Sequence, residues 1–329
     1  MDLIGMDEAG YGPKIGPLVV ALSKWRFSGI GEDCEGKKLD HYLRQAFALP
    51  AGSSGPGDQQ KLVPIADSKQ VYRCRKDLFA LEQGVLPLLH LAGWQGHSFR
   101  SLLNFSDPTA GDASKGLPWL ADYDVPIPRA AAQKSFSAAA WYLRERFTQL
   151  QIQLVEYRAR IIFEPEFNRR LRQWGNKAET LWQVGMELLG ESVLNSCSSR
   201  VVVLADRQGG RVYYGSLLSR FGERLGLRLD SVLQESPMES AYRFQREGGS
   251  LEIWFSVKGE RFLAVAAASM LAKYLRELVL EAFNRFWRER IPTLRPTEGY
   301  PADAKRFKAE ITGVQERLCI PEDFFWRER

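Results

Sequence analysis

Two acidic side chains, Asp7 and Glu8, directly follow a short apolar segment near the start of the chain. Residues 3–6 have the composition of a buried strand, and a glycine-containing turn separates the acids from a second apolar segment at 18–22. Neighbouring carboxylates at the end of a buried strand repel each other and lose hydration, a cost that a divalent cation or a shared proton would offset. The pair therefore predicts a hard-metal site with oxygen ligands; the simpler alternative is a polar turn that faces water.

Two more acids stand at comparable places further along the chain. Asp206 ends the apolar segment 200–205, which has the composition of a deeply buried strand. Glu260 lies between an alternating segment that ends near Val257 and a long helical segment, where the helix dipole favours a carboxylate. Because functional groups gather at strand ends in α/β sheets, adjacent strands would bring these acids and the first pair into one metal-binding cluster. The simpler alternative for Glu260 is an exposed glutamate at a helix start.

The segments that must position these acids alternate between strands and helices. We expect a strand pair within 1–27 and strands at 151–163, 200–205 and 251–257. We expect helices at 69–91, 130–150, 178–194, 261–290 and 302–311. Residues 93–128 are rich in Gly, Pro and Asp and are expected to be irregular, and 51–60 is expected to be a mobile loop. The alternation predicts an α/β domain with a central sheet, onto which the small residues at 264–269 let the long helix pack closely.

Composition narrows the classes of function. The 329 residues are 45% hydrophobic, enough for one large core, and the net charge of +5 is compatible with a polyanionic partner. Four cysteines and three histidines are scattered without zinc-ligand spacing or a neighbouring nucleophile, so neither a zinc site nor a Ser-His-Asp mechanism is expected. The acidic start is unlike a signal peptide, and the longest apolar run, 262–272, is too short to span a bilayer. We therefore expect a cytoplasmic monomer that binds no membrane.

Five segments, in order along most of the chain, resemble motifs of the type 2 ribonuclease H family, which includes bacterial ribonucleases HII and HIII. They are GMDEAGYGPKIGPLVV at 5–20, ADSKQVYRCRKDL at 66–78, VVVLADRQGG at 201–210, KGERFLAVAAASMLAKYLRE at 258–277 and TEGYPADAKRF at 297–307. The resemblance implies a ribonuclease H-like α/β fold, with a mixed central sheet flanked by helices. It implies one catalytic domain over 1–329, with insertions at 28–60 and 93–150 and a helical C-terminal region from about 291.

The resemblance also implies a reaction. The family's acidic cluster corresponds here to Asp7, Glu8, Asp206 and Glu260, which would hold two Mg²⁺ or Mn²⁺ ions. The implied activity is endonucleolytic hydrolysis of the RNA strand of RNA/DNA hybrids, or of ribonucleotides embedded in duplex DNA, leaving 5′-phosphate and 3′-hydroxyl ends. The fourth acid is an aspartate in ribonuclease HII and a glutamate in ribonuclease HIII, so Glu260 favours the HIII variant without settling the classification.

A second group of residues is implied to hold the nucleic acid. They are Gly10, Tyr11, Gly12, Lys69, Lys258, Lys273 and Tyr300. In the family, the loop at 10–12 carries Arg or Lys between its glycines and helps sense the ribonucleotide 2′-hydroxyl, whereas this chain has Tyr11. Tyrosine can stack or hydrogen-bond but offers no cation, so the substrate preference stays open. Solvated surface positions are the simpler alternative for the lysines, as is a core or surface position for Tyr300.

The sequence leaves three functions open. The first is the RNA/DNA-hybrid endonuclease. The second is a nucleic-acid-binding protein of the same fold with lost or altered cleavage, which the replacement at Tyr11 favours. The third is a related metal nuclease that acts on DNA or on a structured RNA. The four acids argue against a pure binding protein, because clustered negative charge opposes binding to phosphates.

Overall fold

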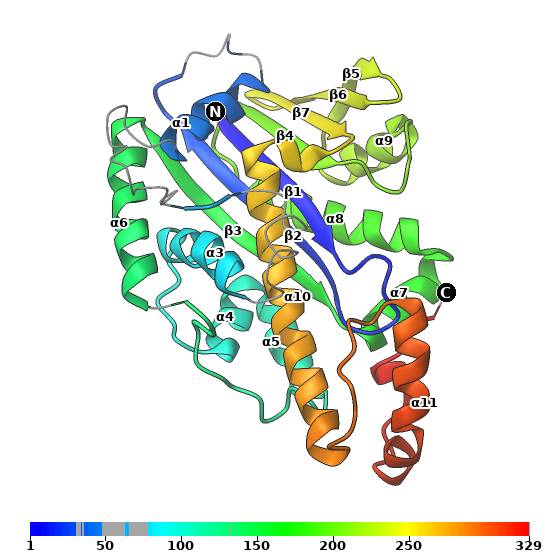
Figure 1. Cartoon of the computed structure of the whole chain (residues 1–329). Helices are drawn as coiled ribbons and strands as arrows, with labels where there is room; N and C mark the ends of the chain where they lie inside the picture. The colour runs from blue at the N-terminus through cyan, green and yellow to red at the C-terminus, as the bar shows by residue number, and fades with distance from the viewer. Residues whose placement is uncertain (31–33, 35, 48–62, 66–77, 132, 329) are drawn as a thin grey trace.

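The structure, a computed structural model, describes the chain except for residues 31–33, 35, 48–62, 66–77, 132 and 329. Its centre is a seven-stranded sheet with the order β3-β2-β1-β4-β7-β6-β5 (Figure 1). The bounds are β1 Asp2–Ala9, β2 Leu18–Phe27, β3 Ile152–Ile162, β4 Arg200–Asp206, β5 Arg228–Glu235, β6 Glu239–Arg246 and β7 Gly249–Ser256. Strand β4 runs parallel to both β1 and β7, and the other pairs are antiparallel. The expected α/β class with a mixed sheet is confirmed.

Helices cover both faces of this sheet. The bounds are α1 Lys38–Phe47, α3 Phe79–Leu91, α4 Phe99–Ser106, α5 Pro108–Ser114, α6 Gln133–Gln149, α7 Glu164–Trp174, α8 Lys177–Leu194, α9 Gly215–Arg224, α10 Leu263–Arg290 and α11 Pro301–Arg317. Side chains alternate along a strand, so Leu3 of β1 joins the apolar cluster that contains α10, and Ile4 joins the one that contains α8. Within the described ranges, no helix is both long and apolar enough to cross a membrane.

Most expected elements are confirmed, with small shifts at their ends. The four expected strand regions and the helices at 130–150, 178–194, 261–290 and 302–311 all contain the corresponding elements. Only the part of the 69–91 helix that begins at Phe79 can be assessed, and the proposed loop at 51–60 lies outside the described residues. Helices α1 and α9 and strands β5 and β6 lie in segments to which no element was assigned.

The expectation that 93–128 is irregular is wrong, because helices α4 and α5 lie within it. Each begins at a residue whose side chain caps the first turn. Ser98 accepts a hydrogen bond from the backbone of Ser101, and Asp107 accepts one from the backbone of Thr109. Pro108 occupies the first position of α5, where the missing N–H costs nothing. The Gly, Pro and Asp content that suggested a loop therefore includes helix-start signals.

Helix α10 crosses the sheet in direct backbone contact with β1 (Figure 1). A Cβ at Gly5 would lie 2.1 Å from the carbonyl carbon of Ala264, so no side chain fits between strand and helix. Neighbouring strands bind the same helix backbone: the Ser23 hydroxyl donates to Ala264 O at 2.8 Å, and the Tyr157 hydroxyl donates to Ala267 O at 2.8 Å. The small residues at 264–269 thus allow close packing, as expected from the sequence.

Substituting Gly5→Ala should push α10 away from β1 and destabilise the fold by about 3 kcal/mol, the upper range for overpacking a core. Urea denaturation of the variant measures this loss. Gly185→Ala on α8 is the matched control, because its added Cβ would meet nothing nearer than 3.7 Å, and alanine favours a helix. A midpoint for Gly5→Ala equal to that of the parent would contradict the packing argument.

Candidate active site

The acids meet at the carboxyl ends of two adjacent parallel strands. Strands β1 and β4 are in register up to the pair Met6 and Ala205, and the next residues along each strand are Asp7 and Asp206. Asp7 lies on the same face of β1 as Gly5, two residues before it, and therefore faces α10. The expected adjacency of the two acid-bearing strands is confirmed.

Glu260 reaches this edge through η1, a single 3₁₀ turn at Gly259–Arg261 just before α10. The backbone N–H of Gly259 donates to Asp206 Oδ1 at 2.7 Å. A Cβ at Gly259 would lie 2.8 Å from the Asp206 Cα, so glycine permits this close approach. The turn therefore orients the Asp206 carboxylate and brings the next residue, Glu260, to the same edge of the sheet.

Ser269 of α10 lies between two of the carboxylates. Its hydroxyl donates to Glu260 Oε1 at 3.1 Å and also hydrogen-bonds to Asp7. A hydroxyl has one proton, so it can satisfy only one carboxylate oxygen at a time. The pair therefore shares a single donor, and a proton or a cation between the acids would be favourable.

The electrostatic state of Asp7 shows that the other three acids act on it. Asp7 is 7% exposed, and burial raises the pKa of its carboxyl well above the ordinary 3.8. The negative charges of Glu8, Glu260 and Asp206 raise the pKa further, in that order, while the Ser269 hydrogen bond opposes them. A bound cation would relieve both the repulsion and the loss of hydration.

The donor chemistry of this cluster fits a hard divalent cation such as Mg²⁺ or Mn²⁺, because every candidate ligand is a carboxylate. In the described part of the chain, however, no three Asp, Glu, His or Cys side chains lie close enough together to form a finished metal site. A small hollow of about 10 Å³ is lined mostly by apolar side chains, with Asp7, Glu8, Asp206 and Gln208 as its polar residues, and it has space for roughly one water-sized group. The side chains would have to move inward around an ion.

Two residues of the loop after β4 belong to this site but were not assigned from the sequence. Gln208 lines the hollow, and its buried Oε1 has no hydrogen-bond partner among the described residues. The Arg211 guanidinium is close enough to Tyr11 to lower the pKa of that phenol. Their positions, two and five residues after Asp206, are the available signal, because loops that follow sheet strands carry functional groups.

The glycine-containing loop between β1 and β2 lies beside the cluster, as expected. Gly10 has φ +88°, and a Cβ there would lie 2.4 Å from Pro17 O, so only glycine fits. A Cβ at Gly12 would meet nothing within 4 Å, so the backbone is open to an approaching ligand at that position. Tyr11 packs partly against the core, and its pKa is raised by burial and by the charge of Glu8.

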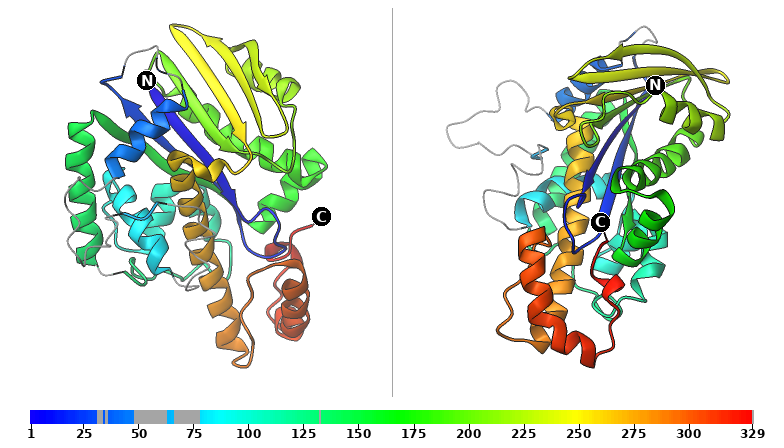
Figure 2. Two further views of the ribbon diagram at one scale, coloured as in Figure 1. Left: turned by 45° about the horizontal axis from the view of Figure 1, so that its top comes forward. Right: turned by 90° about the vertical axis from the view of Figure 1, so that its right-hand side faces the viewer.

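Hydrogen bonds with residues distant in sequence restrain this loop. The buried Arg327 guanidinium donates to Gly10 O at 2.5 Å and also to Gly16 O, and the Gly16 N–H donates to Glu164 Oε1 at 2.6 Å. Burial lowers the pKa of Arg327 to about 9, so the side chain stays charged at neutral pH. Its positive charge opposes the rise that burial causes in the pKa of Glu164. Figure 2 shows the C-terminal end of the chain beside this loop.

The other expected substrate residues lie at different distances from the cluster. Tyr300 is 51% exposed and follows Gly299, whose carbonyl accepts a hydrogen bond from the Lys14 backbone at 2.7 Å, so it lies against the same loop. Lys258 is exposed and directly precedes η1. Lys273 is one turn beyond Ser269 on α10 and pairs with Glu277 at 2.7 Å. Lys69 lies outside the described residues.

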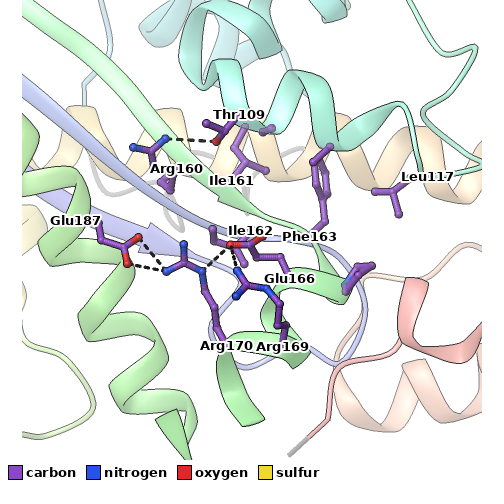
Figure 3. Close-up of a pocket in the computed structure, with 13 residues that line it drawn as sticks. Thr109, Leu117, Arg160, Ile161, Ile162, Phe163, Glu166, Arg169, Arg170 and Glu187 are labelled. Carbon is purple, nitrogen blue, oxygen red and sulfur yellow. Dashed lines mark hydrogen bonds and ion pairs between the residues drawn. The ribbon is translucent and has the colours of Figure 1, made fainter. Parts of the chain in front are cut away.

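A larger pocket, of about 590 Å³, lies elsewhere, at the junction of β3 and α7 (Figure 3). Its arginines are paired with acids: Arg170 contacts Glu166 at 2.7 Å and Glu187 at 2.9 Å, and Arg169 contacts Glu166 at 3.1 Å. None of the four clustered carboxylates lines this pocket. It is therefore separate from the candidate active site.

Removing the Arg327 guanidinium, by Arg327→Met, should destabilise the protein by about 3 kcal/mol, because two loop carbonyls lose their donor and the buried Glu164 loses the stronger-acting of two cations, keeping only Arg276. Chemical denaturation measures the loss, and hydrogen exchange should show faster opening at 10–17. The control is Arg317→Met at the exposed end of α11, expected to change stability by less than about 0.5 kcal/mol. Equal stability of the two variants would contradict the proposed support of the loop.

Neutralising the most buried acid, by Asp7→Asn, should stabilise the metal-free protein by at least about 1 kcal/mol at pH 8. The folded-state pKa of Asp7 lies above 3.8, so the parent loses stability as the pH rises through that raised pKa, and the gain from the variant shrinks towards acidic pH. Thermal melting across pH measures this. Mg²⁺ should raise the melting temperature of the parent more than that of the variant. A lower melting temperature for Asp7→Asn at pH 8 would contradict this prediction. The control is Asp112→Asn, an exposed acid whose replacement should leave the melting temperature unchanged.

No model of a known protein family matches the chain, and the search of curated proteins returns no match. Among solved structures, the chain is similar to a chain of the PCNA:RNase HII complex from Archaeoglobus fulgidus, at 15% identity and a TM-score of 0.40, over 100% of this chain and 95% of that one. It is similar to Bst-RNase HIII in complex with Mn²⁺, at 12% identity and a TM-score of 0.41, over 99% of this chain and 66% of that one. It is also similar to ribonuclease H2 from Pyrococcus horikoshii, at 14% identity and a TM-score of 0.37, over 99% and 92% of the two chains.

Proposed function

We propose that the protein is a metal-dependent endonuclease that hydrolyses the RNA strand of RNA/DNA hybrids, or ribonucleotides embedded in duplex DNA. One observation carries the proposal: β1, β4 and η1 bring Glu8, Asp206 and Glu260 close enough to the buried Asp7 for the charge of each to act on it. Like charges gathered in a buried place destabilise a fold unless a cation or a proton joins them. The open backbone at Gly12 beside this cluster leaves space for a strand to approach.

The roles of the acids follow from their positions. Asp7, Glu8, Asp206 and Glu260 would hold Mg²⁺ or Mn²⁺. Such ions supply an activated water and stabilise the leaving 3′-oxygen, which produces 5′-phosphate and 3′-hydroxyl ends. The Gly259 N–H orients Asp206, and the Ser269 hydroxyl restrains Glu260 and Asp7.

Substrate recognition is proposed for the loop at 10–12 and the exposed residues around it. Gly12 allows close backbone approach, and Tyr11 and Tyr300 offer aromatic surfaces and hydroxyls to the sugar. The 2′-hydroxyl distinguishes RNA from DNA, so these residues would set specificity. We propose that Lys258, Lys69 and Lys273 contribute positive charge near the phosphates, with Lys273 acting alongside its partner Glu277.

We further propose that the whole chain 1–329 works as one catalytic domain, with 28–60 and 93–150 as insertions and a helical C-terminal region from about 291. One apolar cluster contains side chains of α3 to α6 together with side chains of α10, which supports a single domain with a shared core. Cys197 and Cys319 carry free thiols, which is compatible with the reducing cytoplasm where we propose that the protein acts as a monomer.

A nucleic-acid-binding protein with lost or altered cleavage is the second candidate. The observation that favours it is the spacing of the acids, since no three of the described Asp, Glu, His or Cys side chains lie close enough together to hold a metal ion. Against it, an acidic cluster gives no advantage in binding phosphates. The two candidates differ in whether a divalent cation produces cleavage.

The test is cleavage of two labelled duplexes, one with a single ribonucleotide in DNA and one a continuous RNA/DNA hybrid, each with Mg²⁺ or Mn²⁺. We expect metal-dependent cutting that falls at least about 100-fold in Asp7→Asn, because that side chain is central to the cluster. Asp112→Asn, an exposed acid of α5, is the control and should cut normally.

The preferred duplex then separates the HII-like from the HIII-like variant. No cutting by folded protein that still binds either duplex would support the binding protein instead. Cutting that persists in Asp7→Asn would overturn the assignment of the acids.

A further inference from the structure

Arg211 occupies a defined place in the loop between β4 and α9. Gly209 and Gly210 have φ of +57° and +78°, which turns the chain back after Asp206. The Arg211 N–H then donates to Gln208 O at 3.1 Å and closes the turn. The loop therefore turns back and brings the Arg211 guanidinium near Tyr11 of the loop at 10–12.

Aromatic side chains form the wall behind this guanidinium. Its centre lies 5.7 Å from the ring of Trp182 and 5.8 Å from the ring of Tyr214. The Tyr214 ring is itself fixed, because it stacks on Phe255 with ring centres 3.8 Å apart. Arg211 also acts electrostatically on Tyr11, a residue that senses the charge of Glu8 as well. The cation therefore lies against a rigid aromatic wall and close to the loop at 10–12.

Arg211 has unused hydrogen-bonding capacity. Its buried Nη1 has no partner, and the side chain forms no ion pair with any residue that the structure describes. Arg170 in the separate pocket differs, since two glutamates pair with it. A buried N–H without a partner is costly and rare in folded proteins, so a ligand that accepts from it is expected.

We propose that Arg211 binds a backbone phosphate of the nucleic-acid strand that lies across the acidic cluster. The inference rests on the proposed function. A guanidinium offers several donors in one plane, which suits phosphate oxygens, and its weak hydration lets it remain against aromatic rings until the ligand arrives. Glu8 acts electrostatically on both Tyr11 and Asp7, so the loop at 10–12 connects Arg211 with the acidic cluster, which favours a strand that passes both groups as the ligand.

The test measures duplex binding without cleavage, with an RNA/DNA hybrid in EDTA over a range of salt concentrations. Arg211→Ala should weaken binding about 10-fold and reduce the slope of log K against log salt by about 1, the effect of one lost phosphate contact. Arg211→Lys should restore the slope while leaving affinity below that of the parent, because lysine keeps the charge and loses the planar fork.

Arg285→Ala is the matched control. Arg285 is 59% exposed, pairs with Glu289 at 2.8 Å, and lies sixteen residues beyond Ser269, roughly 24 Å along α10. Its removal should leave the salt slope unchanged. Thermal melting of each variant identifies a loss caused by unfolding, and Arg211→Lys supplies the answer if Arg211→Ala does not fold.

The outcomes separate the two proposals. A parent that binds duplex, with Arg211→Ala and Arg211→Lys of unchanged affinity and slope, overturns the phosphate contact and leaves the proposed function standing. A parent that binds no duplex in EDTA and cuts none with Mg²⁺ or Mn²⁺ overturns the proposed function, and the phosphate contact with it. Competition by free inorganic phosphate at millimolar concentration in the parent, without any effect of Arg211→Ala on duplex binding, would also overturn the contact with the strand.

Discussion

The backbone contact between helix α10 and strand β1 is the constraint on which the candidate site depends. Strand and helix touch at Gly5 and Ala264, where any side chain on the strand would occupy the space of the helix backbone. Because no bulk separates them, Ser269 comes close enough to hydrogen-bond to Asp7. The same contact fixes the first turn of α10. The preceding turn η1, which carries Glu260, is thereby held at the carboxyl ends of β1 and β4. Close packing of two backbones thus sets the positions of the carboxylates.

The cluster that results opposes the stability of the fold. Asp7 is buried, and three further negative charges raise the free energy of its ionised form. The surrounding apolar clusters on both faces of the sheet contribute the stability that tolerates this cost. The low local polarity that makes the charges unfavourable together also strengthens their attraction for a cation. Functional sites commonly conflict with local stability in this way.

The loop beside the acids depends on residues from three parts of the chain. Arg327, near the end of the sequence, donates hydrogen bonds to two carbonyl oxygens of the loop. Glu164 accepts a hydrogen bond from one of the loop's N–H groups. The tail is held in turn by Asn168 of α7, whose side chain donates to Trp326 O at 2.8 Å and accepts from the Glu328 N–H at 2.8 Å. A loop that must expose backbone to a ligand cannot bury much of its own surface, so partners outside the loop restrain it.

The sequence by itself determined the local features. Apolar runs located β1 and β4, the acids after them marked the strand ends, and the alanine-rich segment identified the tightly packed part of α10. These features are readable because each depends on neighbours within one turn or one strand. The helix caps at Ser98 and Asp107 also depend only on sequence neighbours. They were not recognised because the surrounding Gly and Pro residues suggested irregular structure.

Tertiary structure alone decided which of these features meet. The parallel pairing of β1 with β4 joins residues about two hundred positions apart, and the contacts of Arg211 with Trp182 and of Arg327 with Gly10 have no local pattern. Such contacts depend on how all the elements pack, because each element has several faces and only the assembled core selects among them. The sequence could therefore place the four acids at element ends, but their mutual approach around Asp7 and the unpartnered state of the Arg211 Nη1 required the folded chain.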